Sequence, residues 1–245
     1  MSSIPSFAKT ISSAPLLNKP RFIFELSKDS QNRFIELETI IFPYVLLELV
    51  EQVAPEIWEI KTKEYPSSSQ LYIDSKFFNP IPIPLEREIE LPSREEVVET
   101  MKKLEGIRYF WGGSYPYGIP NILKFYPHIQ DRDDLSDLIC QGIDCSGLLY
   151  FASNGWTPRN TSQLIHFGTK ICESSLSSEE LQTILKPLDI IVWKGHVIIA
   201  VSHDTVIESR IDKGVVFSPL KKRFPEVQKL AKEQNQELFI RRWYP

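Results

Sequence analysis

The cysteine at position 145 stands in a short sequence, Asp-Cys-Ser-Gly, whose residue types favour a reactive thiol. Asp144 is a good N-cap, and the apolar residues after Gly147 can face a core, so we expect a helix that begins at Cys145. The unpaired amides and the dipole at a helix N-terminus favour the thiolate, which is the nucleophilic form of cysteine. The alternative interpretation of Cys145 is a buried side chain that serves as a small hydrophobe.

A thiolate nucleophile needs a base, and His196 is the best placed of the four histidines. It follows Gly195 at the start of an apolar run that is typical of a core strand, where its ring could face the N-terminus of a packed helix. A bend at His203 and Asp204 would bring Glu208 back alongside His196, where its carboxylate could orient the ring. A structural histidine at a sheet end and a solvated strand carboxylate are the alternative interpretations.

The first part of the chain has the pattern of a small β domain. Residues 21–83 contain four segments in which apolar and polar side chains alternate between turn residues, and this predicts a β-barrel or sandwich. Residues 1–20 are rich in serine and proline and are expected to form an arm. The proline-rich stretch 79–93 predicts an extended linker, placed at residues 84–92. The four expected strand segments are RFIFEL, ETIIFPYVLLELV, IWEIKT and QLYID.

The second part, residues 93–245, mixes helix and strand patterns. Ser93 and Glu96 form a capping-box pattern, which predicts a helix that ends near Gly106. Further expected elements are a long loop over 114–143, hairpin strands over 189–201 and 205–209, and an exposed helix over 226–236.

The composition excludes several classes of protein. A formal net charge of −4 at pH 7 is unlike the basic footprint of a nucleic-acid-binding protein. No apolar stretch reaches the roughly 18 residues that a membrane span needs, and the N-terminus lacks a secretory pattern, so we expect a cytoplasmic protein. Three cysteines without a CxxC pair fit neither a disulfide framework nor a structural zinc site. We expect a monomer that uses no metal and no cofactor.

Five short motifs follow one another along the chain. They are Tyr-x-Trp-Gly-Gly at 109–113, Asp-Cys-Ser-Gly-Leu at 144–148, Pro-Arg-Asn-Thr at 158–161, Lys-Pro-Leu-Asp at 186–189 and Gly-His-Val at 195–197. In this order they resemble the NlpC-type (NlpC/p60 superfamily) cysteine peptidases of bacterial cell-wall turnover. The resemblance extends from about residue 106 to residue 220.

The resemblance implies an α+β, papain-like fold in which the helix bearing the nucleophile packs on an antiparallel sheet. It implies a small SH3-like β-barrel before this catalytic domain. Cys145 becomes the nucleophile and His196 the base, while Glu208 takes a third polar position that is a second histidine in many members. The substrate-binding residues that the resemblance implies are Asp144, Ser146, Tyr109, Trp111 and Thr161.

Members with such a barrel cleave the bond between γ-D-glutamate and a diamino acid in peptidoglycan stem peptides. We therefore expect an endopeptidase that acts on stem peptides or muropeptides with a free N-terminal L-alanine and meso-diaminopimelate, in wall degradation or recycling. Two alternatives stay open. One is a catalytically inactive protein that binds wall fragments, and the other is a thiol amidase or acyltransferase that acts on another substrate.

Overall fold

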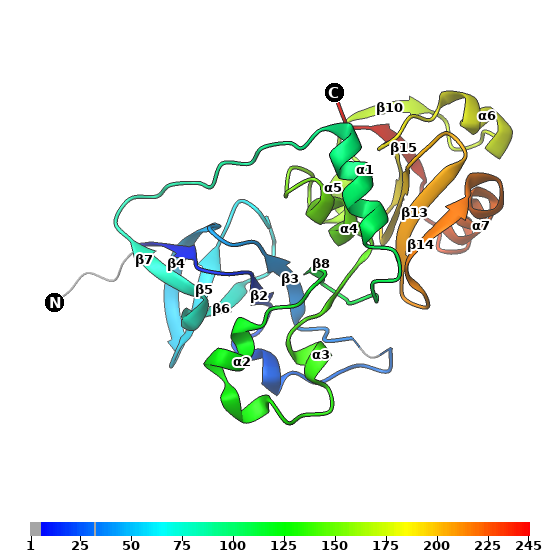
Figure 1. Cartoon of the computed structure of the whole chain (residues 1–245). Coiled ribbons are helices and arrows are strands. Elements are labelled where there is room, and N and C mark those ends of the chain that lie inside the picture. Colours follow the sequence, from blue (N-terminus) through cyan, green and yellow to red (C-terminus); the bar gives the residue numbers. More distant parts are fainter. Residues whose placement is uncertain (1–5, 32) are drawn as a thin grey trace. The chain divides into compact units, whose positions relative to one another are not determined.

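The computed structural model describes residues 6–31 and 33–245, and these fall into two compact units (Figure 1). The first unit consists of the described residues up to Ile89 together with Phe110–Ile143. The second unit consists of Glu90–Tyr109 together with Asp144–Pro245. Within the described residues, no helix has the length and apolarity that crossing a membrane requires.

The first unit is built on an antiparallel sheet of seven strands in the order β3-β2-β6-β5-β4-β1-β7. Two short 3-10 helices, η1 (Ile23–Glu25) and η2 (Ser75–Phe77), connect strands. The strands are β1 (Phe7–Thr10), β2 (Ala14–Leu17), β3 (Leu37–Ile41), β4 (Leu46–Ala54), β5 (Ile57–Lys61), β6 (Leu71–Asp74) and β7 (Phe78–Ile81).

Three segments of this sheet differ from the sequence-based expectation. The segment 21–26, expected as a strand, contains η1, because the Glu25 carboxylate caps its first turn. The apolar segment 38–50 is divided between β3 and β4 by a turn at Tyr44, whose φ is 65°. The expected arm supplies β1 and β2. Alternate side chains of β1 are buried, and all four side chains of β2 are buried. Residues 1–5 of that arm lie outside the described residues.

The segment 114–143, expected as a long loop, carries short elements that pack within the first unit. Apolar side chains spaced along it are buried, including Ile122 and Leu138, and they supply the core contacts that a solvated loop lacks. Its elements are β8 (Ser114–Tyr115), α2 (Asn121–Phe125), η3 (Pro127–Ile129), α3 (Leu135–Leu138) and β9 (Gly142–Ile143), of which β8 and β9 pair.

The second unit is built on a six-stranded antiparallel sheet in the order β10-β15-β11-β12-β13-β14. Its strands are β10 (Thr169–Cys172), β11 (Ile190–Trp193), β12 (His196–Ala200), β13 (Thr205–Arg210), β14 (Gly214–Pro219) and β15 (Phe239–Arg242). Its helices are α1 (Arg94–Lys103), α4 (Cys145–Ala152), α5 (Thr161–Leu164), α6 (Ser178–Ile184) and α7 (Leu220–Glu233).

Helices cover both faces of this sheet. One face packs against α6 and α7 in a cluster that includes Ile198, Phe224 and Val227. Figure 1 shows α1, α4 and α5 on the other face. The sheet is therefore buried on both sides, which explains the almost unbroken apolar runs of β11 and β12. His196, the first residue of β12, lies at the end of this buried run and is only half-buried.

The expected helix and hairpin patterns of the second unit are confirmed, with shifted limits. Ser93 caps α1 in a capping box with Glu96, although the helix ends at Lys103 instead of Gly106. The hairpin of β12 and β13 turns through residues 201–204. The helix expected over 226–236 is α7, which begins six residues earlier because its buried stripe starts at Leu220. The expectation that this helix is exposed is wrong, because Phe224 and Val227 pack in the core of the second unit.

We expect Gly214→Ala to destabilise the second unit more than Gly106→Ala. Both glycines have a left-handed φ, of 69° and 81°. A Cβ at Gly214 would lie 2.2 Å from the backbone oxygen of Ile107, whereas a Cβ at Gly106 meets nothing within 4 Å. Urea unfolding should show a loss of about 1 kcal/mol for Gly106→Ala, and about 2–4 kcal/mol for Gly214→Ala. Equal losses would contradict the steric argument.

Candidate active site

The first turn of α4 presents Cys145 at its N-terminus. As expected from the sequence, the helix begins at Cys145 and Asp144 is its N-cap, since the Asp144 carboxylate accepts a hydrogen bond of 2.7 Å from the Gly147 amide. Cys145 is only 6% exposed. The Cys145 amide is one of the N-terminal donors that a helix leaves without an internal acceptor. The thiol group therefore lies beside unpaired amides and the positive end of the helix dipole.

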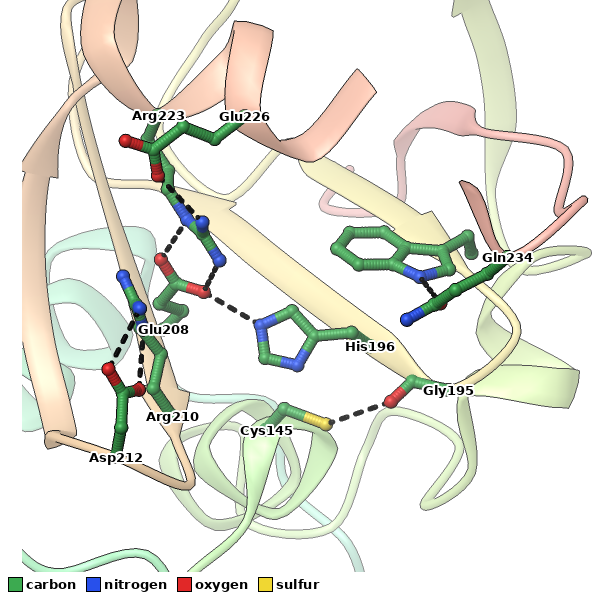
Figure 2. Close-up of polar contacts among 10 residues, drawn as sticks. Cys145, Gly195, His196, Glu208, Arg210, Asp212, Arg223, Glu226 and Gln234 are labelled. Atoms are coloured by element: carbon green, nitrogen blue, oxygen red, sulfur yellow. Dashed lines mark hydrogen bonds and ion pairs between the residues drawn. The ribbon is translucent and has the colours of Figure 1, made fainter. Parts of the chain in front are cut away.

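The two strands β12 and β13 bring His196 and Glu208 together. The His196 Nε2 and Glu208 Oε2 atoms are 2.7 Å apart (Figure 2). The side chain of His196 is 18% exposed, and that of Glu208 is not exposed at all. Figure 2 shows the second ring nitrogen, Nδ1, on the side of the ring that faces the Cys145 sulfur. The imidazole thus stands between a thiol and a carboxylate. In enzymes with a cysteine nucleophile, a histidine base in this position is oriented by a third polar group.

Electrostatic interactions in this cluster favour the charged form of the ring. Burial alone would lower the pKa of His196, but the Cys145 thiolate and the Glu208 carboxylate outweigh it and raise the pKa to about 9. Burial alone would raise the pKa of Glu208, but hydrogen bonds from His196 and Arg223 hold it below its usual range. The ring therefore stands between the Cys145 sulfur and an ionised carboxylate, and its charged form is favoured there.

The sequence analysis did not identify Arg223, on α7, as part of this cluster. Its Nε and Nη2 atoms donate to Glu208 Oε1 and Oε2 at 2.5 and 2.7 Å. The signal for it was present in the sequence. Arg223 lies on the buried stripe of α7 beside Phe224, between Leu220 and Val227, where an unpaired cation would be costly.

Asp144 and Ser146 belong to a second buried polar cluster. Arg159 donates to the two Asp144 carboxylate oxygens at 3.0 and 2.6 Å and to the Ser146 hydroxyl at 2.8 Å. The Ser146 hydroxyl in turn donates to Asp144 Oδ1 at 3.3 Å. Arg159 is a second group that the sequence analysis left without a role, although its motif was noted. Its bidentate contact balances the charge of Asp144 and fixes the start of α4.

The remaining expected binding residues lie in different parts of the chain. The Thr161 hydroxyl accepts a hydrogen bond of 3.0 Å from the Gly195 amide, and the Gly195 carbonyl lies 4.0 Å from the Cys145 sulfur. Thr161 therefore fixes the turn that precedes His196. Tyr109 is half-buried in the second unit, whereas Trp111 belongs to the first unit, where the Arg33 guanidinium lies 5.0 Å from its ring. Their binding roles stay predictions.

The other two cysteines have a different environment. Burial raises the pKa of Cys140, and burial with nearby carboxylates raises the pKa of Cys172. Both thiols are free. Among the described residues, no group of three or more His, Cys, Asp and Glu side chains is arranged to hold a metal ion. Cys145 is thus the cysteine whose surroundings suit nucleophilic chemistry.

Comparison with known proteins gives structural likenesses only. No family model and no curated protein matches the chain. An NlpC/P60 family protein from Bacillus cereus is 16% identical with a TM-score of 0.42, over 98% of this chain and 63% of that protein. NlpC2 from Trichomonas vaginalis is 15% identical with a TM-score of 0.40, over 99% and 74%. RipD from Mycobacterium tuberculosis, described as a non-catalytic NlpC/p60 domain protein adapted to peptidoglycan binding, is 17% identical with a TM-score of 0.40, over 64% and 99%. Likenesses this distant assign no activity to the chain.

We expect NMR titration of the His196 ring to give a pKa of about 9 in the wild-type protein and a lower pKa in Cys145→Ser, because serine removes the thiolate charge. Since the folded-state pKa lies above the ordinary value of about 6.5, the ion pair contributes stability below that pH and loses it as the pH rises through about 9.

The matched control for this titration is Cys172→Ser, which removes a thiol of the same unit outside the cluster. It should leave the pKa of His196 unchanged. A pKa of His196 that is the same in Cys145→Ser as in the wild-type protein would contradict the thiolate–imidazolium pair.

Proposed function

We propose that the protein is a cysteine peptidase of the NlpC/P60 type that hydrolyses the γ-D-glutamyl–L-diamino acid bond of peptidoglycan stem peptides. The observation that carries the proposal is the position of Cys145 at the start of α4, beside a histidine that a buried carboxylate orients. All three side chains belong to the second unit. This combination of nucleophile, base and orienting group is the chemical requirement for acyl transfer by a thiolate.

The proposed reaction proceeds through an acyl-enzyme. The Cys145 thiolate attacks the carbonyl carbon of the γ-glutamyl amide, and the Cys145 amide donates to the oxyanion that forms. As the carbon–nitrogen bond breaks, the His196 imidazolium gives its Nδ1 proton to the leaving amine. A water molecule then gives a proton to His196 and attacks the thioester carbon. The carbon–sulfur bond breaks, D-glutamate leaves with its γ-carboxyl group, which loses its proton to solvent, and the thiolate–imidazolium pair is restored.

Substrate selection is proposed from the motifs that the sequence shares with this class of peptidase. Asp144 and Ser146 would contact the free ammonium of the N-terminal L-alanine, in a site whose charge Arg159 partly balances. Tyr109, Trp111 and Thr161 would contribute further contacts. The seven-stranded antiparallel sheet of the first unit is proposed as the SH3-like domain, with meso-diaminopimelate as the diamino acid.

The test is hydrolysis of the tripeptide L-Ala-γ-D-Glu-meso-diaminopimelate by the purified full chain. We expect mass spectrometry to show the dipeptide L-Ala-D-Glu and free diaminopimelate as products. Cys145→Ala should lower the rate at least about 10³-fold, because it removes the nucleophile. Cys172→Ala should stay within about twofold of the wild-type rate.

The same samples distinguish the alternatives. Circular dichroism of Cys145→Ala shows whether the variant is folded, so that lost activity is not mistaken for lost structure. Full activity in a folded Cys145→Ala would exclude the proposed mechanism. Binding of the tripeptide by calorimetry without any product would identify a binding protein instead. A product in which the acyl group is joined to an added amine would identify an acyltransferase.

A further inference from the structure

The Glu208 carboxylate is held by two cations that come from different elements of the second unit. His196, at the start of β12, contacts its Oε2 atom, and Arg223, on α7, contacts both oxygens. Glu208 has no exposed side-chain surface and Arg223 has 6%. Because water does not reach this carboxylate, its charge and its orientation depend on these two partners (Figure 2).

The geometry of the Arg223 contact determines which way the carboxylate faces. Nε binds Oε1 and Nη2 binds Oε2, so the planar guanidinium fixes the plane of the carboxylate. In that plane, Oε2 faces the ring nitrogen of His196. Arg210, two residues along the same strand, does not share this role, because its guanidinium is paired with Asp212 at 3.0 Å.

The far end of α7 also contacts the surroundings of His196. The ring of Trp193 lies 5.1 Å from the His196 ring, centroid to centroid. Its indole N–H donates to the side chain of Gln234, the C-cap of α7, at 3.1 Å. Figure 2 shows Gln234 and Glu208 on different sides of the imidazole. One helix therefore holds both the carboxylate that binds the ring and the indole that packs beside it.

We propose that Arg223 is a positioning residue for the catalytic base, one that keeps the Glu208 carboxylate ionised and directed at His196. The inference rests on the proposed function, because it supposes that His196 acts as a base, and it deepens that function by adding a fourth group. The Arg223 guanidinium pairs with Glu208 and, through Nη1 at 2.9 Å, with the exposed Glu226 of its own helix, so its link to the His196 ring runs through Glu208.

The test compares Arg223→Met and Arg223→Lys with the wild-type chain. Methionine keeps an unbranched apolar stem but loses both hydrogen bonds, and lysine keeps the charge but loses the planar two-point contact. The control is Arg242→Met, which removes a similar bidentate contact of the second unit, that of Arg242 with Asp189 at 2.8 and 2.6 Å. A purely structural effect would appear in both methionine variants.

We expect kcat to fall at least about tenfold in Arg223→Met, with KM within about twofold, and to recover in part in Arg223→Lys. Arg242→Met should keep the wild-type kcat even where its thermal stability falls. Since the experiment needs folded protein, circular dichroism is recorded for each variant. If Arg223→Met does not fold, a kcat in Arg223→Lys equal to that of the wild-type protein would overturn the proposal.

The pKa of His196, measured by NMR, distinguishes positioning from a simple field effect. If Arg223 acted only as a nearby positive charge, its removal would raise the pKa of His196. If it orients Glu208, its removal lowers that pKa toward the ordinary value, and this is the expected result. An unchanged or higher pKa in Arg223→Met overturns the proposal. The titration needs no substrate. If the wild-type chain does not cleave the tripeptide, the proposed function is wrong, but the titration still tests the role of Arg223.

Discussion

The ionised carboxylate of Glu208, buried without any exposed surface, is the charge on which the candidate site depends. An isolated carboxylate in such a place costs several kcal/mol and would take up a proton instead. The described structure avoids this by placing a guanidinium at 2.5–2.7 Å on one side and an imidazole at 2.7 Å on the other. The imidazole thereby gains a fixed orientation, and its charged form is favoured beside the thiol.

The fold of the second unit explains how these groups meet. The antiparallel hairpin of β12 and β13, in which Ile199 pairs with Ile207, brings His196 within 2.7 Å of Glu208, while α4 and α7 cover opposite faces of the sheet. The thiol comes from the helix on one face and the guanidinium from the helix on the other. His196 lies where β12 begins, between the thiol of α4 and the Glu208 carboxylate that the guanidinium of α7 holds. The candidate site therefore needs both helices, α4 for the thiol and α7 for the guanidinium.

The sequence predicted the parts of this site that local patterns encode. An N-cap at Asp144 located the start of α4, and apolar runs on either side of the bend near His203 located the hairpin that carries His196 and Glu208. Arg223 was missed because the expected helix, over 226–236, began after it, and because only tertiary packing brings it to Glu208. For the same reason, nothing local showed that 110–143 packs with the first unit, since buried residues do not specify which core they enter.

The residue that orients His196 is a carboxylate, Glu208, and its charge depends on pH differently from that of a histidine. A second histidine would change its charge near neutral pH, whereas a carboxylate with a lowered pKa paired to a guanidinium with a raised pKa keeps a constant charge there. Across the neutral range, the charges of Glu208 and Arg223 therefore stay constant. A buried carboxylate also requires a cation that a neutral histidine does not. Glu208 and Arg223 are therefore best understood as one physical unit, in which each residue makes the burial of the other possible.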